Sequence, residues 1–394
     1  MERVSNMARQ EIIRRQKKAY QKAAKKTKGA ILDTICQATG MSRDRAGRLL
    51  RENQNVKKEP VKRRGRKPQY HHPSIHRLLE KLWFLMDCAC GKRLCAGLPG
   101  MIDALVRHGE IQAPEWTIQA VLRISPATAD RLLAQTRRAN TLMGRSATKP
   151  GSIRKKDIPI RLGSQWDDHR PGYIEMDLVA HCGETTAGEY VNTLDMTDIY
   201  SGWTETVAVL NKAQKHVFAA IQTVRARLPF DLLGLDSDNG SEFINDQMYR
   251  YCKKENLLFT RSRPHKKNDN CHVEQKNYSV VRKHIGYARY EGEKVVKLLN
   301  KYYAHLRLHT NFFMPSVKLV EKERIGARVY KRYDSPTTPY ERLMVSPDIS
   351  HKEKLALKTQ FHLLNPVVLK RDMMELTDQI LSLAIHRTRS GHGI

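Results

Sequence analysis

Three short stretches in the middle of the chain each present one carboxylate, and they restrict the possible folds more than any other feature. These stretches are Gly172–Val179, Leu233–Phe243 and Asn268–Asn277. Asp177 and Asp238 each follow apolar residues typical of a strand, whereas Glu274 falls in the first turn of a predicted helix. Because α/β folds carry reactive groups where strands end and helices begin, we expect these three acids to meet.

The residues around these stretches alternate between strand and helix patterns. Strands are predicted at residues 173–180, 189–195, 204–210, 232–236 and 257–260. Helices are predicted at residues 215–228, 246–256 and 270–289. The first three strands form a meander and the last two alternate with helices, so the order predicts an α/β fold with a mixed five-stranded sheet.

The chemistry of the three acids indicates a metal site. Carboxylate oxygens are hard ligands that suit Mg²⁺ or Mn²⁺. Two such ions, about 4 Å apart, activate the attacking oxygen and stabilise the leaving oxygen in phosphoryl transfer. We therefore expect Asp177, Asp238 and Glu274 to be catalytic residues that bind two ions. Without metal, their mutual repulsion should raise their pKa values.

Other acids compete for these roles. Asp236 and Glu175 each lie two residues before a favoured aspartate, so each shares a strand face with it. We favour Asp238 because Asn239–Gly240 makes a turn directly after it. We favour Asp177 because Glu175 lies deeper in its strand. The remaining nearby acids are interpreted as turn or surface residues: Asp195, Asp198 and Glu242.

The composition points to a polyanionic partner. The chain has 70 Lys and Arg against 41 Asp and Glu, a net charge of +29. Nucleic acid is the first candidate, although a basic ribosome-associated protein has the same balance. Seven irregularly spaced cysteines argue against a disulfide framework, and no apolar run has the length of a membrane span. We expect a cytoplasmic, nucleoid-associated protein that contacts no membrane.

The N-terminal region resembles a DNA-reading module. Residues 1–55 comprise a basic arm and two predicted helices that meet at Gly40. Arg43, Arg45 and Arg48 lie on the second helix, so the outline is a helix-turn-helix that reads the major groove. An ordinary helical hairpin is the alternative. In the basic linker at residues 56–72, Arg64 and Arg66 flank a glycine and form either a minor-groove hook or a flexible cationic connection.

A second helical DNA-binding domain is predicted at residues 73–140, followed by a linker at 141–160. Ser125 and Pro126 begin a helix, as an N-cap and a first-turn proline. The outward positions of that helix include Thr128, Arg131 and Gln135, the pattern of a second recognition helix.

Further candidate DNA contacts lie beside the third acid. The polar, cationic segment at residues 262–270 carries Arg263, Lys266 and Lys267, which we expect to hold phosphates. Asn277 lies on the helix face of Glu274 and is expected to orient that carboxylate or to contact DNA. The C-terminal region, residues 293–394, combines a basic strand or loop at 324–333 with a mainly helical tail, which packs on the core or joins subunits.

Taken together, the motifs resemble the integrase-core transposases of bacterial insertion sequences, which are related to retroviral integrases. Residues 237–243 (SDNGSEF) match the second-acid motif of that family, and the 35 residues between Asp238 and Glu274 match its usual spacing. Asn277 matches the third-acid helix, and residues 311–315 (NFFMP) resemble the segment that closes the core. The tryptophan that usually precedes the first acid is absent. The resemblance covers roughly residues 160–325.

The resemblance implies a ribonuclease H-like catalytic core at residues 161–292, with helical DNA-binding modules before it and a mainly helical tail after it. It also implies a DDE transposase, a Mg²⁺-dependent polynucleotidyl transferase and endonuclease. Such an enzyme binds the ends of its element on double-stranded DNA, cleaves there and joins the 3′-OH ends to target DNA. A homo-oligomer in a synaptic complex is expected. Because the sequence has no Gly-x-x-x-x-Gly-Lys-Ser/Thr loop, any use of ATP would reside in a separate ATPase partner. The alternative is a non-catalytic DNA-binding regulator built on the same domains.

Overall fold

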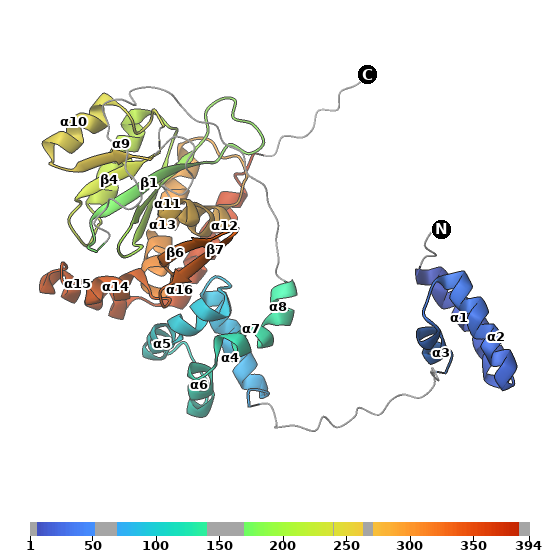
Figure 1. Ribbon diagram of the computed structural model, residues 1–394. Coiled ribbons are helices and arrows are strands. Elements are labelled where there is room, and N and C mark those ends of the chain that lie inside the picture. The colour runs from blue at the N-terminus through green and yellow to red at the C-terminus, as the bar shows by residue number, and fades with distance from the viewer. Residues whose placement is uncertain (1–5, 52–68, 140–168, 239, 263–270, 386–394) are drawn as a thin grey trace, which may run out of the picture. The chain divides into compact units, whose positions relative to one another are not determined.

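The structure, a computed structural model, describes residues 6–51, 69–139, 169–238, 240–262 and 271–385 (Figure 1). The chain divides into two compact units, Met1–Pro68 and Gln69–Ile394. The first unit consists of α1 (Asn6–Lys22), α2 (Lys25–Thr39) and α3 (Arg43–Arg51). Gly40 ends α2 with a φ of 67°, which glycine adopts without a steric penalty. The small core of this unit comprises Ile13, Tyr20, Ile35, Ala46 and Leu50.

The second unit begins with five helices. They are α4 (Pro73–Leu85), α5 (Gly91–Arg107), α6 (Glu115–Leu122), α7 (Pro126–Leu132) and α8 (Ala134–Ala139). Ser125 caps α7 by accepting a hydrogen bond from the Thr128 backbone, and Pro126 is in the first turn, as predicted. Leu133 ends α7, so the predicted recognition helix is divided into two short helices.

A five-stranded mixed sheet occupies the middle of the chain, as the sequence pattern predicts. Its strands are β1 (Tyr173–Ala180), β2 (Asn192–Asp198), β3 (Thr204–Val209), β4 (Gly234–Ser237) and β5 (Leu258–Arg261). The spatial order is β3-β2-β1-β4-β5. The β1–β2 and β2–β3 pairs are antiparallel, and the β1–β4 and β4–β5 pairs are parallel.

The helices between and after the strands also follow the predicted pattern. They are α9 (Gln214–Arg225), α10 (Asp246–Lys254), α11 (Cys271–Lys276), the π-helix η1 (Asn277–Arg282) and α12 (Lys283–Ile285). Because side chains alternate along a strand, β1 turns Ile174 and Met176 to one side of the sheet and Glu175 and Asp177 to the other. The polar side receives α11 and η1, which positions the candidate site.

The remaining elements form the C-terminal part. They are α13 (Glu293–Phe313), β6 (Leu319–Ile325), β7 (Arg328–Tyr333), α14 (Pro339–Val345), α15 (His351–Leu363) and α16 (Pro366–Leu381). On α13, the Asn311 side chain donates to the Thr204 carbonyl and accepts from the Thr204 amide, both at 2.9 Å. Asn300 pairs with Ala208 in the same way. The two amides thereby satisfy the outer edge of β3, which would otherwise expose unpaired backbone groups.

Helices α4 and α5 pack with the C-terminal helices in the same unit as the sheet. Arg93 Nε donates to the Pro315 carbonyl (2.5 Å), and His309 Nε2 lies 2.7 Å from the Leu85 carbonyl oxygen. At Gly97 a Cβ atom would lie only 2.3 Å from Met86 Cε, so glycine permits the close packing. In the part of the chain that the structure describes, no helix has the length and apolarity needed to cross a membrane.

Candidate active site

The register of the central strands brings the first two acids together. Met176 on β1 pairs with Ser237, the last residue of β4. Asp177 and Asp238 directly follow this pair on adjacent parallel strands, so their carboxylates meet near the end of β4. Gly240 N donates to Asp238 Oδ1 (2.9 Å), which holds the carboxylate in the turn after the strand.

The helix of the third acid is fixed to β1 at two points. Glu175 Oε2 accepts a hydrogen bond from Val273 N (3.1 Å), so the Glu175 carboxylate lies at the N-terminal end of α11. Asn277 Nδ2 donates to Asp177 Oδ2 (2.6 Å). Glu274, the residue after Val273, is exposed beside these contacts. The wider π-helical turns begin at Asn277, and such turns are frequent at functional sites.

The local electrostatics show the strain expected of crowded acids. Burial raises the pKa of Asp177 to about 7, and the charges of Asp238 and Glu274 add to the rise. The Leu178 backbone amide and the Asn277 side chain oppose it. Burial also raises the pKa of Asp238. Burial is the main cause of the rise at both strand residues, and the predicted repulsion between the acids contributes at Asp177.

A further acid beside Asp177 is buried, which corrects the expectation of a turn or surface position. Asp195 is the cross-strand partner of Asp177 on β2, and it is fully buried rather than on a turn or the surface. Burial raises its pKa to about 8, while nearby Lys276 lowers it and Asp177 raises it. Burial also lowers the pKa of Lys276 to about 8. The strand alternation was visible in the sequence, but the β1–β2 register that pairs these acids was not.

The other rival acids have structural partners. Asp236 is buried and accepts a hydrogen bond from the Thr260 hydroxyl. Asp198 is buried at the end of β2, where it accepts hydrogen bonds from Gly172 N (2.8 Å) and Ser201 N (2.7 Å). The expectation of a surface position is wrong for Asp198, but its role in the β2–β3 turn is as predicted. Glu242 is half-buried close enough to Asp238 for burial and that charge to raise its pKa.

The donor set fits a divalent cation. Asp177, Asp238 and Glu274 supply only hard oxygen atoms, and no cationic side chain of the described residues is among the groups that shift the pKa of Asp177. Within the described ranges, no three His, Cys, Asp or Glu side chains form a group that could hold an ion. The hydrogen bond from Asn277 occupies one oxygen of Asp177, so binding an ion there requires that the side chains rearrange.

The candidate DNA-contact residues are dispersed over the chain. In the first unit, Arg45 and Arg48 on α3 are exposed. Arg43 is paired with Asp33 and also reaches the Gly29 carbonyl (3.5 Å). The other five predicted contacts of this kind lie outside the described residues. They are Arg64, Arg66, Arg263, Lys266 and Lys267.

On α7, the guanidinium of Arg131 donates to the Thr128 hydroxyl (3.0 Å), and Gln135 is exposed on α8. The structure does not bring these residues together with the acids at one local site, and their contact with DNA stays a prediction.

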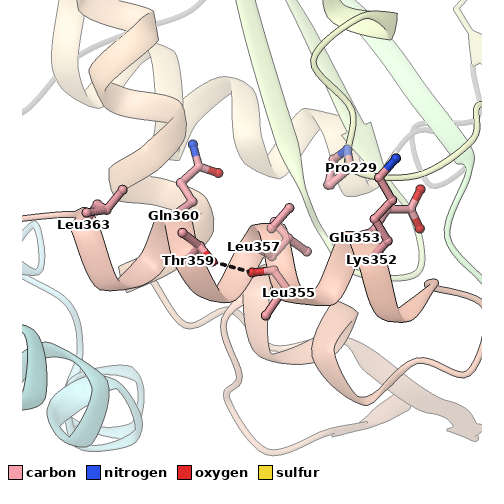
Figure 2. Close-up of a pocket in the computed structure, with 9 residues that line it drawn as sticks. Pro229, Lys352, Glu353, Leu355, Leu357, Thr359, Gln360 and Leu363 are labelled. Atoms are coloured by element: carbon pink, nitrogen blue, oxygen red, sulfur yellow. Dashed lines mark hydrogen bonds between the residues drawn. The ribbon is translucent and has the colours of Figure 1, made fainter.

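A groove of about 680 Å³ lies apart from the acids, between α15 and Pro229 (Figure 2). Leu355, Leu357 and Leu363 line it, and Figure 2 shows the Thr359 hydroxyl bonded to the Leu355 carbonyl (2.9 Å). None of the three candidate acids lines this groove. It therefore offers an apolar surface rather than a site for acid chemistry.

Comparisons with known proteins identify a domain in the middle of the chain. A family model described as the integrase core domain matches residues 167–267. This match includes Asp177 and Asp238 and ends seven residues before Glu274. The chain therefore contains an integrase core domain at these residues.

One curated relative extends the similarity over most of the chain. It is the uncharacterized protein y4rM of Sinorhizobium fredii (strain NBRC 101917 / NGR234), 38% identical over 340 residues. The alignment covers 86% of this chain and 96% of the relative. The similarity therefore reaches well beyond the catalytic core, into the helical regions on either side.

Solved structures with a related arrangement include two viral integrase cores. The catalytic core of BIV integrase is 15% identical, with a TM-score of 0.28, and covers 43% of this chain and 91% of that core. The magnesium complex of the HTLV-2 integrase core is 14% identical, with a TM-score of 0.26, and covers 37% of this chain and 90% of that core. At these scores the likeness carries no argument about function.

Proposed function

We propose that this protein is a DNA transposase of a bacterial insertion sequence. It binds the ends of its element, cleaves the DNA there and joins the freed 3′-OH ends to target DNA. The observation that carries the proposal is the half-buried Asp177 carboxylate, whose pKa is raised by burial and by the charges of Asp238 and Glu274. The net charge of +29 supports DNA as the substrate.

The residues of the candidate site have two kinds of role, metal binding and positioning. Asp177, Asp238 and Glu274 would hold two Mg²⁺ or Mn²⁺ ions. These ions, when bound, supply charge stabilisation for the attacking and leaving oxygens. Asn277 positions the Asp177 carboxylate through its 2.6 Å hydrogen bond. Glu175 positions the start of α11, and therefore Glu274, through Val273 N.

Both chemical steps are in-line displacements at phosphorus. In the first, a water oxygen forms a bond to phosphorus, the P–O3′ bond breaks, and a 3′-OH and a 5′-phosphate result. In the second, that 3′-OH attacks a phosphorus of the target, whose own P–O3′ bond breaks. The proton of the attacking group passes to solvent, and the leaving 3′ oxygen takes one up. No covalent protein intermediate is needed.

Several regions of the chain would bring DNA to the acids. We propose that α3 with Arg43, Arg45 and Arg48, and α7–α8 with Thr128, Arg131 and Gln135, bind the element ends. The predicted contacts Arg64, Arg66, Arg263, Lys266, Lys267 and Asn277 would hold phosphates or orient the site. Because two ends are processed together, a homo-oligomer is expected, and any use of ATP would belong to a separate partner.

The test is metal-dependent cleavage and strand transfer by Asp238→Asn, with the exposed Asp231→Asn as the matched control. We expect the first variant to lose at least about a thousandfold in rate, because removing a metal ligand removes several kcal/mol of charge stabilisation. Binding to element-end DNA should be unchanged in both variants. Normal cleavage by Asp238→Asn would contradict the proposal.

One observation favours a second candidate, a DNA-binding regulator that does no chemistry. Among the described residues, the three acids do not form a ready ion-binding group. In that case Mg²⁺ would neither bind at the acids nor permit strand transfer, while the wild-type protein would still bind element-end DNA. Isothermal titration of the full chain with Mn²⁺ separates the two candidates without an activity assay.

A further inference from the structure

Strands β6 and β7 form an isolated two-stranded ribbon (Figure 1). Every residue of β7 is exposed, and several large side chains are among them: Val329 (46% exposed), Tyr330 (51%) and Tyr333 (49%). Among the described strands, β6 and β7 pair only with each other. A two-stranded ribbon is marginally stable by itself in water, so this one presents an unpartnered surface.

The two faces of the ribbon differ in charge. Alternation along β7 places Val329, Lys331 and Tyr333 on one face and Arg328, Tyr330 and Arg332 on the other. On the second face, Arg332 is paired with Glu321 (2.9 Å), and Tyr330 is the cross-strand partner of Glu323. On the first face, the β7 side chains are the cationic Lys331, the apolar Val329 and the aromatic Tyr333, and none of these described side chains is acidic.

The base of the ribbon is held firmly to the sheet. Asp334 Oδ1 accepts a hydrogen bond from Lys318 N (2.6 Å), and Asp334 Oδ2 is paired with Arg342 Nη2 (3.0 Å). Arg342 is buried and also donates to the Ser201 carbonyl (3.2 Å) in the turn between β2 and β3. A β-bridge between Ser316 and Thr337 closes the base. The exposed face is therefore presented by a fixed support.

We propose that the Val329–Lys331–Tyr333 face of this ribbon binds duplex DNA. A two-stranded antiparallel ribbon has dimensions that the major groove admits. Lysine contributes phosphate contacts, and exposed apolar and aromatic side chains make contacts with sugars and base edges. The opposite face is neutralised by its own glutamates, so charge complementarity selects the first face. This proposal rests on the proposed function, because it supplies that site with an additional DNA contact.

The test compares Lys331→Ala with Arg332→Ala in the full chain. These neighbours share charge and exposure but lie on opposite faces. Binding to a 30-base-pair duplex is measured by fluorescence anisotropy over a series of salt concentrations. For Lys331→Ala we expect the slope of log affinity against log salt to fall by about 0.9, and the affinity at about 0.15 M salt to fall roughly fivefold. Arg332→Ala should retain the wild-type slope. Tyr333→Ala, on the same face as Lys331, should also weaken binding.

Three outcomes would overturn the proposal. The first is wild-type DNA affinity in Lys331→Ala, and the second is an equal loss of DNA affinity in Lys331→Ala and Arg332→Ala. The third is a change in oligomeric state, measured by light scattering, with no change in DNA affinity. The last result would identify the ribbon as a contact between copies of the chain. Because the readout is binding, failure here leaves the cleavage test of Asp238→Asn intact, and failure of that test leaves this one intact.

Discussion

Two aspartates in the same unit, the buried Asp87 and the half-buried Asp177, have opposite electrostatic surroundings. Asp87, at the end of α4, is surrounded by basic groups, whereas Asp177, on β1, is surrounded by acids. Lys370 Nζ is bonded to Asp87 Oδ1, and His309 Nδ1 and His284 Nε2 lie 3.4 Å and 3.7 Å from Oδ2. Burial alone would raise the pKa of Asp87, but the two imidazoles and Lys370 lower it well below its usual range.

The difference between the two aspartates separates a structural role from a functional one. A buried charge is tolerated when it is paired and hydrogen-bonded, and the protein provides both for Asp87. At Asp177 two hydrogen bonds lower the pKa, but no cation among the described residues does, and the pKa rises to about 7. Under the proposed function, a metal ion would supply the positive charge that this carboxylate needs.

The largest expected effect is the loss of stability on removing the charge of Asp87. Asp87→Asn keeps the shape and suits the left-handed backbone at this position (φ 50°), but it leaves Lys370 without its counter-ion. We expect the free energy of unfolding to fall by about 3 kcal/mol, the lower end of the range for broken buried pairs. Urea denaturation measures it. Asp103→Asn, which breaks an exposed pair with Arg107, should cost less than about 1 kcal/mol. Equal losses would contradict the structural role.

Asp177→Asn should change the free energy of unfolding in the opposite direction, so that the variant is more stable than the wild type. The raised pKa means that ionised Asp177 destabilises the folded state: the cost begins above the unfolded pKa near 4 and is complete above about pH 7. In EDTA at pH 7.5, the substitution should therefore stabilise the protein by about 2 kcal/mol, less than the full value of the pKa shift because Asp177 is only half-buried. Adding Mg²⁺ at ten times its Kd should stabilise the wild type by about 1.4 kcal/mol and the variant much less. Thermal unfolding with and without Mg²⁺ measures both effects, and a destabilised variant in EDTA would be the contrary result.

A smaller effect is expected at His181, a buried group beside neither aspartate. Burial and the charge of Arg282 lower its pKa to about 3. Between roughly pH 3 and 6.5 the unfolded chain binds a proton at this histidine that the folded chain does not, so stability falls as the pH falls through this window. His181→Gln should reduce the slope of the free energy of unfolding against pH by up to about 1.4 kcal/mol per pH unit in this window. The exposed His351→Gln is the control. An unchanged slope in His181→Gln would show that burial does not lower the pKa of His181.

The strands and helices of the core were predictable because they depend on local patterns. The strand predicted at residues 173–180 agrees with β1 at both ends. The buried position of Asp195 and the contact between Glu175 and Val273 were not predictable. Both depend on strand register and on the docking of α11, which join residues far apart in the sequence. Because Asp195 is polar, the sequence alone predicted an exposed position for it, whereas the fold buries it.

The shared packing of α4, α5 and the C-terminal helices determines which fragments of the chain can fold. The family match spans residues 167–267, yet the side chains that close the core around it come from both sides of that stretch. Trp83, Leu98 and Phe313 are buried there. A fragment cut at the borders of the match would lack these side chains. The apolar surface that they cover would then be exposed to water, and the fragment would aggregate. The smallest piece suitable for expression and crystallisation therefore begins near residue 69 and extends through α16.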